Sequence, residues 1–220
     1  MTEVSALRND VAGTVLAGGL ARRMGGGDKG MLDLGGRSIL DHVIARLRPQ
    51  VRMVAVNVND DVSRFDSSVF SLAPDMLPGR PGPLAGVLAG LDWTFANVPG
   101  LHWIVTVPTD TPFLPVDLVE RLFAAVKTSG ADMACAASAG RRHPVVGLWP
   151  VHLRNELRQA LIMEGVRKID SWTGRYRVAE ASFSDNPVDP FFNINTPEDL
   201  ATARTLLMSL ECHQPDVAET

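Results

Sequence analysis

The 220-residue sequence lacks most signs of a secreted or membrane-spanning protein. It has only two cysteines, Cys135 and Cys212, and they form no CxxC pair. Two thiols in a chain of this length argue against a disulfide framework and are typical of reduced, structural cysteines. No apolar run approaches the ~20 residues needed to cross a bilayer, and the acidic opening residues do not resemble a signal peptide. These absences predict a soluble cytoplasmic protein.

The sequence also lacks an excess of positive charge. It contains 21 Lys and Arg against 25 Asp and Glu, a net charge of −4, with a pI near 5.7. A broad basic surface for nucleic acid or an anionic membrane is therefore not expected, and an anionic ligand must be held by a local arrangement. The composition, 45% hydrophobic and 21% charged, is that of an ordinary globular protein. We expect one domain over residues 1–220, with flexible tails at 1–10 and 211–220.

Short apolar runs without alternation predict buried strands of a parallel sheet. The predicted strands are residues 11–17, 51–58, 103–107 and 131–136, with a weaker candidate at 69–72. Stretches with apolar residues at helical spacing lie between and after them. These predicted helices carry their stripes over residues 39–47, 84–95, 118–126 and 200–210, with Ser38–Asp41 and Thr196–Pro197 as start signals.

Alternation of strands and helices over residues 11–136 predicts an α/β fold, a doubly wound and mainly parallel sheet with helices on both faces. Residues 137–195 break this rhythm, although a helix is expected near 153–163. We interpret the 137–195 segment as an excursion that returns to the sheet before the last helix.

Glycine and positive charge are concentrated in one connection, LAGGLARRMGGGDKG, from Leu16 to Gly30, which holds six of the nineteen glycines. Its G-x-G-x-x-G match begins eight residues after the predicted strand and leads into no helical stripe, so it does not fit a dinucleotide fingerprint. A Walker A loop requires GK[ST], whereas this chain has Gly-Asp-Lys-Gly. Both standard readings of a glycine-rich loop are therefore disfavoured.

The glycines and cations of this loop still predict an anion-binding site. Gly18 and Gly19 directly follow the strand, where glycines allow the backbone amides to turn inward and form an anion nest. Arg22, Arg23 and Lys29 add charge that can neutralise a polyphosphate. Ligands of open α/β sheets bind beyond the carboxyl ends of the strands, which is where this loop begins.

These residues resemble the signature loop of the molybdenum cofactor guanylyltransferase (MobA) family, LAGG-x-A-R-R-M-G-G-x-D-K-G, within the nucleotidyltransferases. The resemblance implies that Leu16, Ala17, Gly18, Gly19, Arg22 and Lys29 bind GTP, and that Lys29 and Arg23 act in catalysis. Sugar-nucleotide pyrophosphorylases have a looser version, and the related cytidylyltransferase tends to have alanine at the position of Gly18.

Asp110 lies just beyond the predicted strand in WIVTVPTDTPFLP, where a carboxylate can meet Mg²⁺ on a triphosphate. The same family has a strand-end acid as its metal ligand, which implies that role, and a catalytic one, for Asp110.

Other segments match the family as well. The resemblance implies that Asn57, Asp75 and the Gly82-Pro83 turn of PGPLAG contact the nucleotide. Asn193 and Asn195 in FFNINTPE are implied to contact the acceptor or the metal–phosphate assembly, and Arg142 is a further acceptor-side candidate.

The resemblance implies transfer of GMP from GTP to the terminal phosphate of molybdenum-molybdopterin, with Mg²⁺ as cofactor and release of pyrophosphate. It also implies transient contacts with other cofactor-biosynthesis proteins and apo-molybdoenzymes, and no nucleic-acid or membrane partner. Two alternatives remain open. One is another Mg-dependent nucleotidyltransferase that uses CTP or a sugar phosphate, and the other is a non-catalytic nucleotide-binding module.

Overall fold

The computed structural model describes residues 7–17, 29–58, 70–75 and 82–212. Its centre is a seven-stranded sheet with the order β5-β4-β1-β6-β8-β7-β9. The strands are β1 (Val11–Leu16), β4 (Val54–Val58), β5 (Ser71–Pro74), β6 (Trp103–Pro108), β7 (Met133–Ser138), β8 (Arg141–Pro150) and β9 (Val178–Phe183). Six of them run in one direction, and β8 runs antiparallel between β6 and β7. The predicted mainly parallel α/β sheet is confirmed.

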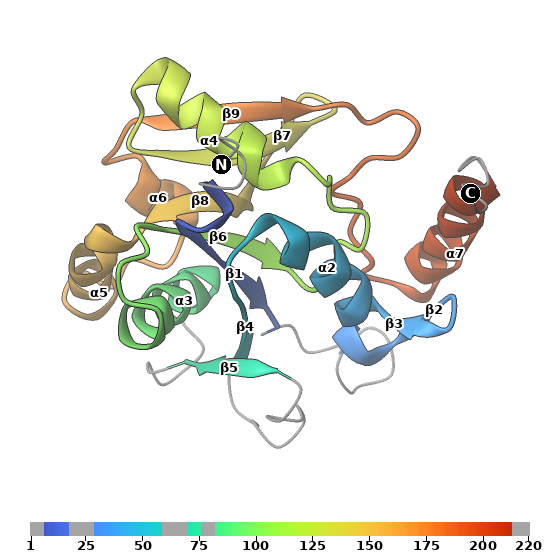
Figure 1. Cartoon of the computed structure of the whole chain (residues 1–220), viewed down its shortest axis with the longest axis horizontal. Coiled ribbons are helices and arrows are strands. Elements are labelled where there is room, and N and C mark those ends of the chain that lie inside the picture. Colours follow the sequence, from blue (N-terminus) through green and yellow to red (C-terminus); the bar gives the residue numbers. More distant parts are fainter. Residues whose placement is uncertain (1–6, 18–28, 59–69, 76–81, 213–220) are drawn as a thin grey trace.

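Helices cover both faces of this sheet (Figure 1). The helices are α2 (Ile39–Leu47), α3 (Pro83–Asn97), α4 (Leu118–Ser129), α5 (Arg154–Ile162), α6 (Ile169–Thr173) and α7 (Pro197–Cys212), with 3₁₀ turns η2 (Lys29–Met31), η3 (Arg48–Gln50) and η5 (Val151–Leu153). The apolar stripes of α2 and α4 pack on one face, and α3, α5 and α6 pack on the other. Burial of these two apolar layers is the main force that holds the layers together.

A third apolar cluster lies apart from the two main layers. The short hairpin β2 (Asp33–Leu34) and β3 (Arg37–Ser38) packs against α7 and the segment before it, with Leu34, Ile194 and Ala203 each fully buried in the cluster. In Figure 1 this hairpin and α7 stand beside the sheet, on the side of its carboxyl edge. The cluster therefore joins the segment after β1 to the last helix, and both segments contribute to the site described below.

The predicted helix starts are confirmed, whereas the strand bounds differ by one to three residues. Ser38 accepts a bond from the Asp41 backbone and completes a capping box at α2. Phe95 is a correction to the predicted buried stripe, because 57% of it is exposed. It lies near the end of α3, where the guanidinium of Arg154 stacks over its ring at 3.9 Å. The ring of Phe95 is therefore covered by Arg154 and not by the apolar layer.

The structure adds detail to two expectations about the chain's organisation. The 137–195 segment was expected to be an excursion that returns to the sheet before the last helix, and within it β8 and β9 lie in the sheet. The sequence of β8 starts with polar residues and carries Pro144, which conceals its strand pattern. In the expected N-terminal tail, residues 7–10 form a turn, and Asp10 bonds to His102 at 2.6 Å.

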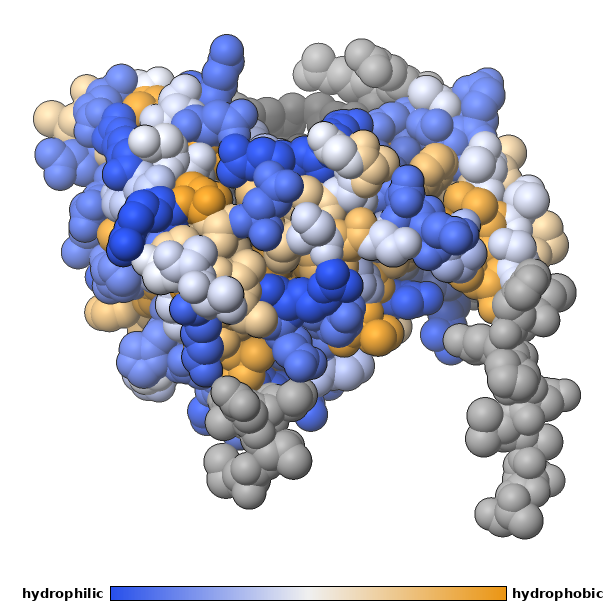
Figure 2. Space-filling model, turned by 90° about the horizontal axis from the view of Figure 1, so that it is seen from above, coloured by the Kyte–Doolittle hydropathy of each residue, from blue (hydrophilic) through white to orange (hydrophobic). Residues whose placement is uncertain are grey.

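The surface is mixed in polarity. Figure 2 shows hydrophobic residues as separate patches between hydrophilic ones on the face in view. Among the described residues, no helix combines the length and the apolar character that a membrane crossing requires.

Candidate active site

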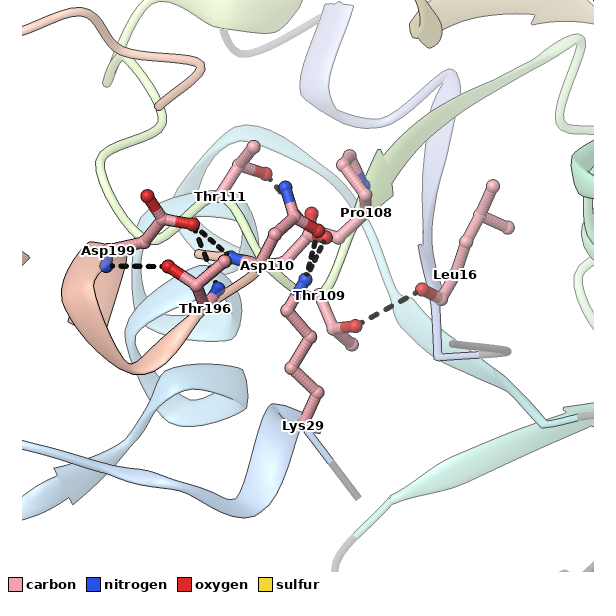
Figure 3. Close-up of polar contacts among 9 residues, drawn as sticks. Leu16, Lys29, Pro108, Thr109, Asp110, Thr111, Thr196 and Asp199 are labelled. Atoms are coloured by element: carbon pink, nitrogen blue, oxygen red, sulfur yellow. Dashed lines mark hydrogen bonds and ion pairs between the residues drawn. The ribbon is translucent and has the colours of Figure 1, made fainter. Parts of the chain in front are cut away.

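The site begins where two neighbouring parallel strands end. Leu16 of β1 lies opposite Pro108 of β6, and both strands stop at this edge of the sheet. The chain after β6 is then tied back to β1, because the backbone amide of Thr109 donates to the Leu16 carbonyl at 3.3 Å and its hydroxyl donates at 3.4 Å (Figure 3). These bonds place Asp110 directly beyond the carboxyl ends of the strands, where open α/β sheets bind ligands.

Lys29 reaches Asp110 from the far end of the glycine-rich connection. Its ammonium nitrogen lies 2.7 Å from Oδ2 of Asp110 and 2.7 Å from Oδ1 of Asn195. Lys29 is only 9% exposed although it is charged. Burial of a lysine is costly unless its charge is paired and bonded, and here both partners meet it. Three segments separated by 81 and 166 residues thus converge on one nitrogen (Figure 3).

The turn before α7 holds Asn195 in place. The backbone amides of Asn195 and Thr196 donate to Oδ2 of Asp199 at 2.8 and 2.9 Å, and the Asp199 amide donates to the Thr196 hydroxyl. This confirms the predicted start of the last helix and forms a capping box. The hydrogen bond from the backbone amide of Asn195 is the main reason why the pKa of Asp199 lies below its usual value. Ile194 also donates to the Asp110 carbonyl at 3.0 Å.

The second carboxylate oxygen of Asp110 is the feature of the site that calls for a ligand. Oδ1 is buried and has no hydrogen-bond partner among the described residues. A buried carboxylate oxygen without a partner is costly, so it marks a place where another group belongs. Mg²⁺ fits, because it commonly takes one or two carboxylates and fills its other positions with phosphate oxygens and waters. The described residues contain no group of three or more His, Cys, Asp and Glu that would form an all-protein cage.

Asn57 and Asp75, both predicted to contact the nucleotide, meet beside β1. Asn57 is 2% exposed, and its amide donates to the Ala73 carbonyl at 2.9 Å and to Oδ1 of Asp75 at 2.8 Å. The helix α3 approaches this pair through Gly86, where an added Cβ would lie 2.5 Å from Oδ1 of Asn57. Only a glycine allows the helix to come so close. These residues therefore form a narrow junction between α3 and the strand ends.

The PGPLAG turn enters α3 as the sequence suggests. Gly82 has φ of 86°, a conformation that side chains rarely adopt, and Pro83 is the first helical residue. Leu16 and Ala17 are buried, each 9% exposed, and the Ala17 amide donates to the Asn57 carbonyl. Predicted residues at β1, β4 and α3 are thus brought together by the structure.

Not every predicted residue joins the Lys29–Asp110 group. Arg142 instead contacts β7 and β9. It donates to Cys135 Sγ at 3.2 and 3.4 Å and lies 3.6 Å from Glu180. Cys135 is a buried free thiol, and burial raises its pKa. Asn193 is exposed in the segment before α7. The predicted Gly18, Gly19, Arg22 and Arg23 lie outside the described residues.

Sequence reasoning missed one polar group at the same edge of the sheet. Ser138 ends β7 and bonds both His143 of β8 and Asp189. Nothing in the sequence signals Ser138, His143 or Asp189 as a group. Their proximity depends on strand pairing and on the path of the chain after β9.

Known proteins place the chain in a family. A family model described as a MobA-like NTP transferase domain matches residues 13–178. A relative from Bradyrhizobium sp. (strain ORS 278), named molybdenum cofactor guanylyltransferase, is 53% identical over 196 residues, which cover 89% of this chain and 92% of the relative. A relative of the same name from Mesorhizobium japonicum is 46% identical over 207 residues, covering 93% and 99% of the two chains.

Solved structures agree with this placement. Molybdopterin-guanine dinucleotide biosynthesis protein A from Archaeoglobus fulgidus has 25% identity and a TM-score of 0.69, covering 90% of this chain and 99% of its own. CMP:2-keto-3-deoxy-manno-octonic acid synthetase complexed with CTP has the same fold, with 13% identity and a TM-score of 0.67, covering 92% and 100%. The strand-end site and these likenesses lead to one conclusion: the chain belongs to the MobA-like NTP transferase family.

Proposed function

We propose that this chain transfers GMP from GTP to the terminal phosphate of molybdenum-molybdopterin, forming the guanine dinucleotide cofactor and pyrophosphate. The observation that carries the proposal is the Lys29–Asp110–Asn195 group at the strand ends, with one oxygen of Asp110 left for a ligand. The guanylyltransferase relatives, of which this chain spans about nine-tenths, support the choice of nucleotide and acceptor.

In this proposal the acceptor phosphate is itself the nucleophile, so no covalent protein intermediate is needed. The protein contributes positioning and charge neutralisation, which dominate catalysis of phosphoryl and nucleotidyl transfer. Lys29 is held between Asp110 and Asn195 at the start of η2, where its charge can stabilise the departing pyrophosphate. Arg22 and Arg23 would add to that charge. The junction of Asn57, Asp75 and α3 would hold the nucleoside side of GTP.

Asp110 would hold Mg²⁺ through its unbonded oxygen Oδ1. When bound, this ion would neutralise phosphate charge and help to align the triphosphate. The nearby Lys29 is compatible with such a site, because an ammonium and a divalent cation can share one anionic substrate. The neutral side-chain oxygen of Asn195 would still accept a hydrogen bond from Lys29 while Asp110 also binds the ion.

Ligand-dependent melting tests the choice of nucleotide. The melting temperature is measured with MgGTP, MgCTP and MgUTP at equal concentrations, and selective stabilisation by MgGTP is expected because binding to the native state raises stability. Stabilisation by CTP alone would favour a cytidylyltransferase.

A pyrophosphate assay with MgGTP and molybdenum-loaded acceptor then separates an enzyme from a binding module. Turnover should disappear when EDTA removes the divalent ion and return when Mg²⁺ is added in excess. Turnover that persists in EDTA would contradict the Mg²⁺ assignment.

The proposal has consequences for the protein's place in the cell. We infer a cytoplasmic enzyme that makes transient contacts with other cofactor-biosynthesis proteins and with apo-molybdoenzymes. We also infer that residues 1–220 form a single nucleotidyltransferase domain. Support comes from the continuous seven-stranded sheet and from the family match over residues 13–178.

A further inference from the structure

A second polar cluster lies at the carboxyl edge of the sheet, on three segments distant in sequence. Ser138 ends β7, His143 lies near the start of β8, and Asp189 belongs to the stretch between β9 and α7. The Ser138 hydroxyl oxygen is 2.8 Å from Nε2 of His143 and 2.7 Å from Oδ1 of Asp189. Ser138 is 3% exposed, so these bonds form away from bulk water.

The number of hydrogens determines the direction of each bond in this cluster. A carboxylate can only accept, so the single hydroxyl hydrogen of Ser138 is donated to Asp189. The Ser138 oxygen must then accept a hydrogen from Nε2 of His143. Neutral His143 therefore carries its proton on Nε2 and has its lone pair on Nδ1. Nδ1 has no hydrogen-bond partner within the part of the chain that the structure describes.

The surroundings of His143 favour the neutral ring. Burial lowers its pKa, and the charge of Arg141 on β8 acts in the same direction. The Asp189 carboxylate opposes them by raising the pKa. On its other side the imidazole packs against the ring of Phe191, with centroids 4.7 Å apart. The result is a half-buried neutral base in a fixed tautomer.

Strand pairing places this base at the same edge of the sheet as the candidate active site. Thr106 of β6 lies opposite Gly147 of β8, and the two strands are antiparallel. Residues 141–146 therefore extend past Thr106 in the direction of Asp110. Asp189 also lies in the segment that leads to Asn195, so one stretch of chain contacts both clusters.

We propose that His143 is the base that removes the proton from the attacking phosphate, and that Ser138 and Asp189 are its positioning residues. This inference rests on the proposed function. A free phosphate monoester has a second pKa of about 6, but the adjacent triphosphate raises it because like charges disfavour ionisation. A base at the acceptor is therefore useful even at neutral pH.

The step balances in atoms and electrons. The singly protonated acceptor phosphate gives its proton to Nδ1 of His143. The freed oxygen forms a bond to the α-phosphorus of GTP, and the bond from that phosphorus to the bridging oxygen of the β-phosphate breaks. The electron pair of that bond leaves with pyrophosphate. The imidazolium is stabilised by the Asp189 carboxylate through the Ser138 hydroxyl, and it returns its proton to water after product release.

The test is the pH dependence of kcat/KM for the acceptor in wild type and in His143→Gln. Glutamine keeps an N–H that can donate to Ser138 but has no basic nitrogen. We expect a deficit of about 100-fold near pH 6, within the usual range for general-base catalysis. The deficit should shrink as pH rises, because the acceptor then arrives already deprotonated. His152→Gln, at an exposed histidine of η5, is the matched control and should match wild type.

A deficit that is constant across pH would mean a purely structural role, and no deficit would mean no role; either result overturns the proposal. MgGTP-induced stabilisation should be unchanged in His143→Gln. If wild type itself transfers no guanylyl group, the proposed function fails instead.

Nitrogen NMR shifts of His143 supply a readout independent of turnover. The neutral ring should show its proton on Nε2, and a proton on Nδ1 would contradict the inference. Asp189→Asn keeps an acceptor oxygen but removes the charge, so the pKa of His143 should fall in this variant.

Discussion

Two acidic side chains, one on a helix and one at the strand ends, show how differently ion pairs can be used. Asp92 on α3 meets two guanidinium groups of α5, from Arg154 at 3.6 Å and from Arg158 at a shorter distance. Asp110 meets a single ammonium, that of Lys29, and keeps its other oxygen buried without a partner among the described residues. The first group joins two helices through Oδ1 of Asp92. The second lacks one partner, as expected of a site prepared for a ligand.

Both sites lie between segments that pack through apolar residues. Asp92, Arg154 and Arg158 lie on elements that already pack together through their apolar faces, so the ion pairs add little. The connections that carry Lys29 and Asp110 also share an apolar cluster, because Leu34 and Phe113 are buried in it together. Apolar packing therefore brings the segments together in both places, but only the Lys29–Asp110 pair includes a buried carboxylate oxygen without a partner among the described residues. The following predictions test this contrast, from the largest expected effect to the smallest.

Asp110→Ala should reduce turnover by about 1,000-fold or more. Charge stabilisation by a bound metal ion is worth several kcal/mol, and about 1.4 kcal/mol corresponds to a factor of ten in rate. The measurement is pyrophosphate release with MgGTP and acceptor, together with a circular dichroism melt to show that the variant is folded. Activity within tenfold of wild type would exclude Asp110 as the metal ligand.

Lys29→Ala should weaken MgGTP binding and slow the chemical step, each by roughly tenfold or more, because a charge close to the triphosphate is lost. Binding is measured by calorimetry and the rate under single-turnover conditions. Lys29→Arg should not restore the rate, since a planar guanidinium group cannot take the position of the compact ammonium between Asp110 and Asn195. An unchanged affinity and rate in Lys29→Ala would place the ammonium outside the reaction.

Gly86→Ala should damage both stability and nucleotide binding. The new Cβ would lie 2.5 Å from Oδ1 of Asn57 and 2.9 Å from Leu16, so α3 must move away from the junction. We expect a loss of about 1–3 kcal/mol in the free energy of unfolding and weaker MgGTP binding. Gly90→Ala, one turn later and 2.4 Å from the Thr14 hydroxyl, is the matched control. It should lose stability while its MgGTP affinity changes much less, and equal losses of affinity would refute a nucleotide role for the Asn57 junction.

Asp92→Ala should have the smallest effect. Surface ion pairs contribute about 0–1 kcal/mol, so a small loss of stability in a urea melt is expected. Guanylyl transfer and MgGTP affinity should equal those of wild type. A loss of activity comparable to that of Asp110→Ala would show that the contrast between the two acids is wrong.

Much of the fold could be predicted because it follows from local patterns. Buried strands appeared as short apolar runs, and Ser38 and Thr196 marked helix starts through their capping bonds. The antiparallel β8 could not be recognised in this way, because its polar beginning and Pro144 hide the strand. The exposure of Phe95 was also unpredictable, since its contact is with Arg154, which is distant in sequence.

In the candidate site, too, local features could be predicted and long-range contacts could not. The types of residue were evident from the sequence, since Lys29 lies in a cationic glycine-rich loop and Asp110 follows a buried strand. The contact between Asn195 and Lys29 was not, because 166 residues separate them and only the docking of α7 joins them. Ser138 and Asp189 carried no signal for the same reason.

The sequence by itself determined the α/β class, the position of the strand-end loop and the chemistry of the groups that follow the strands. These properties depend on periodicity, glycine conformation and charge, which act over a few residues. Only the tertiary structure decided which groups meet, which oxygen of Asp110 lacks a partner and which nitrogen of His143 carries the proton. Those properties depend on contacts between distant segments, and such contacts form only when the apolar layers have packed.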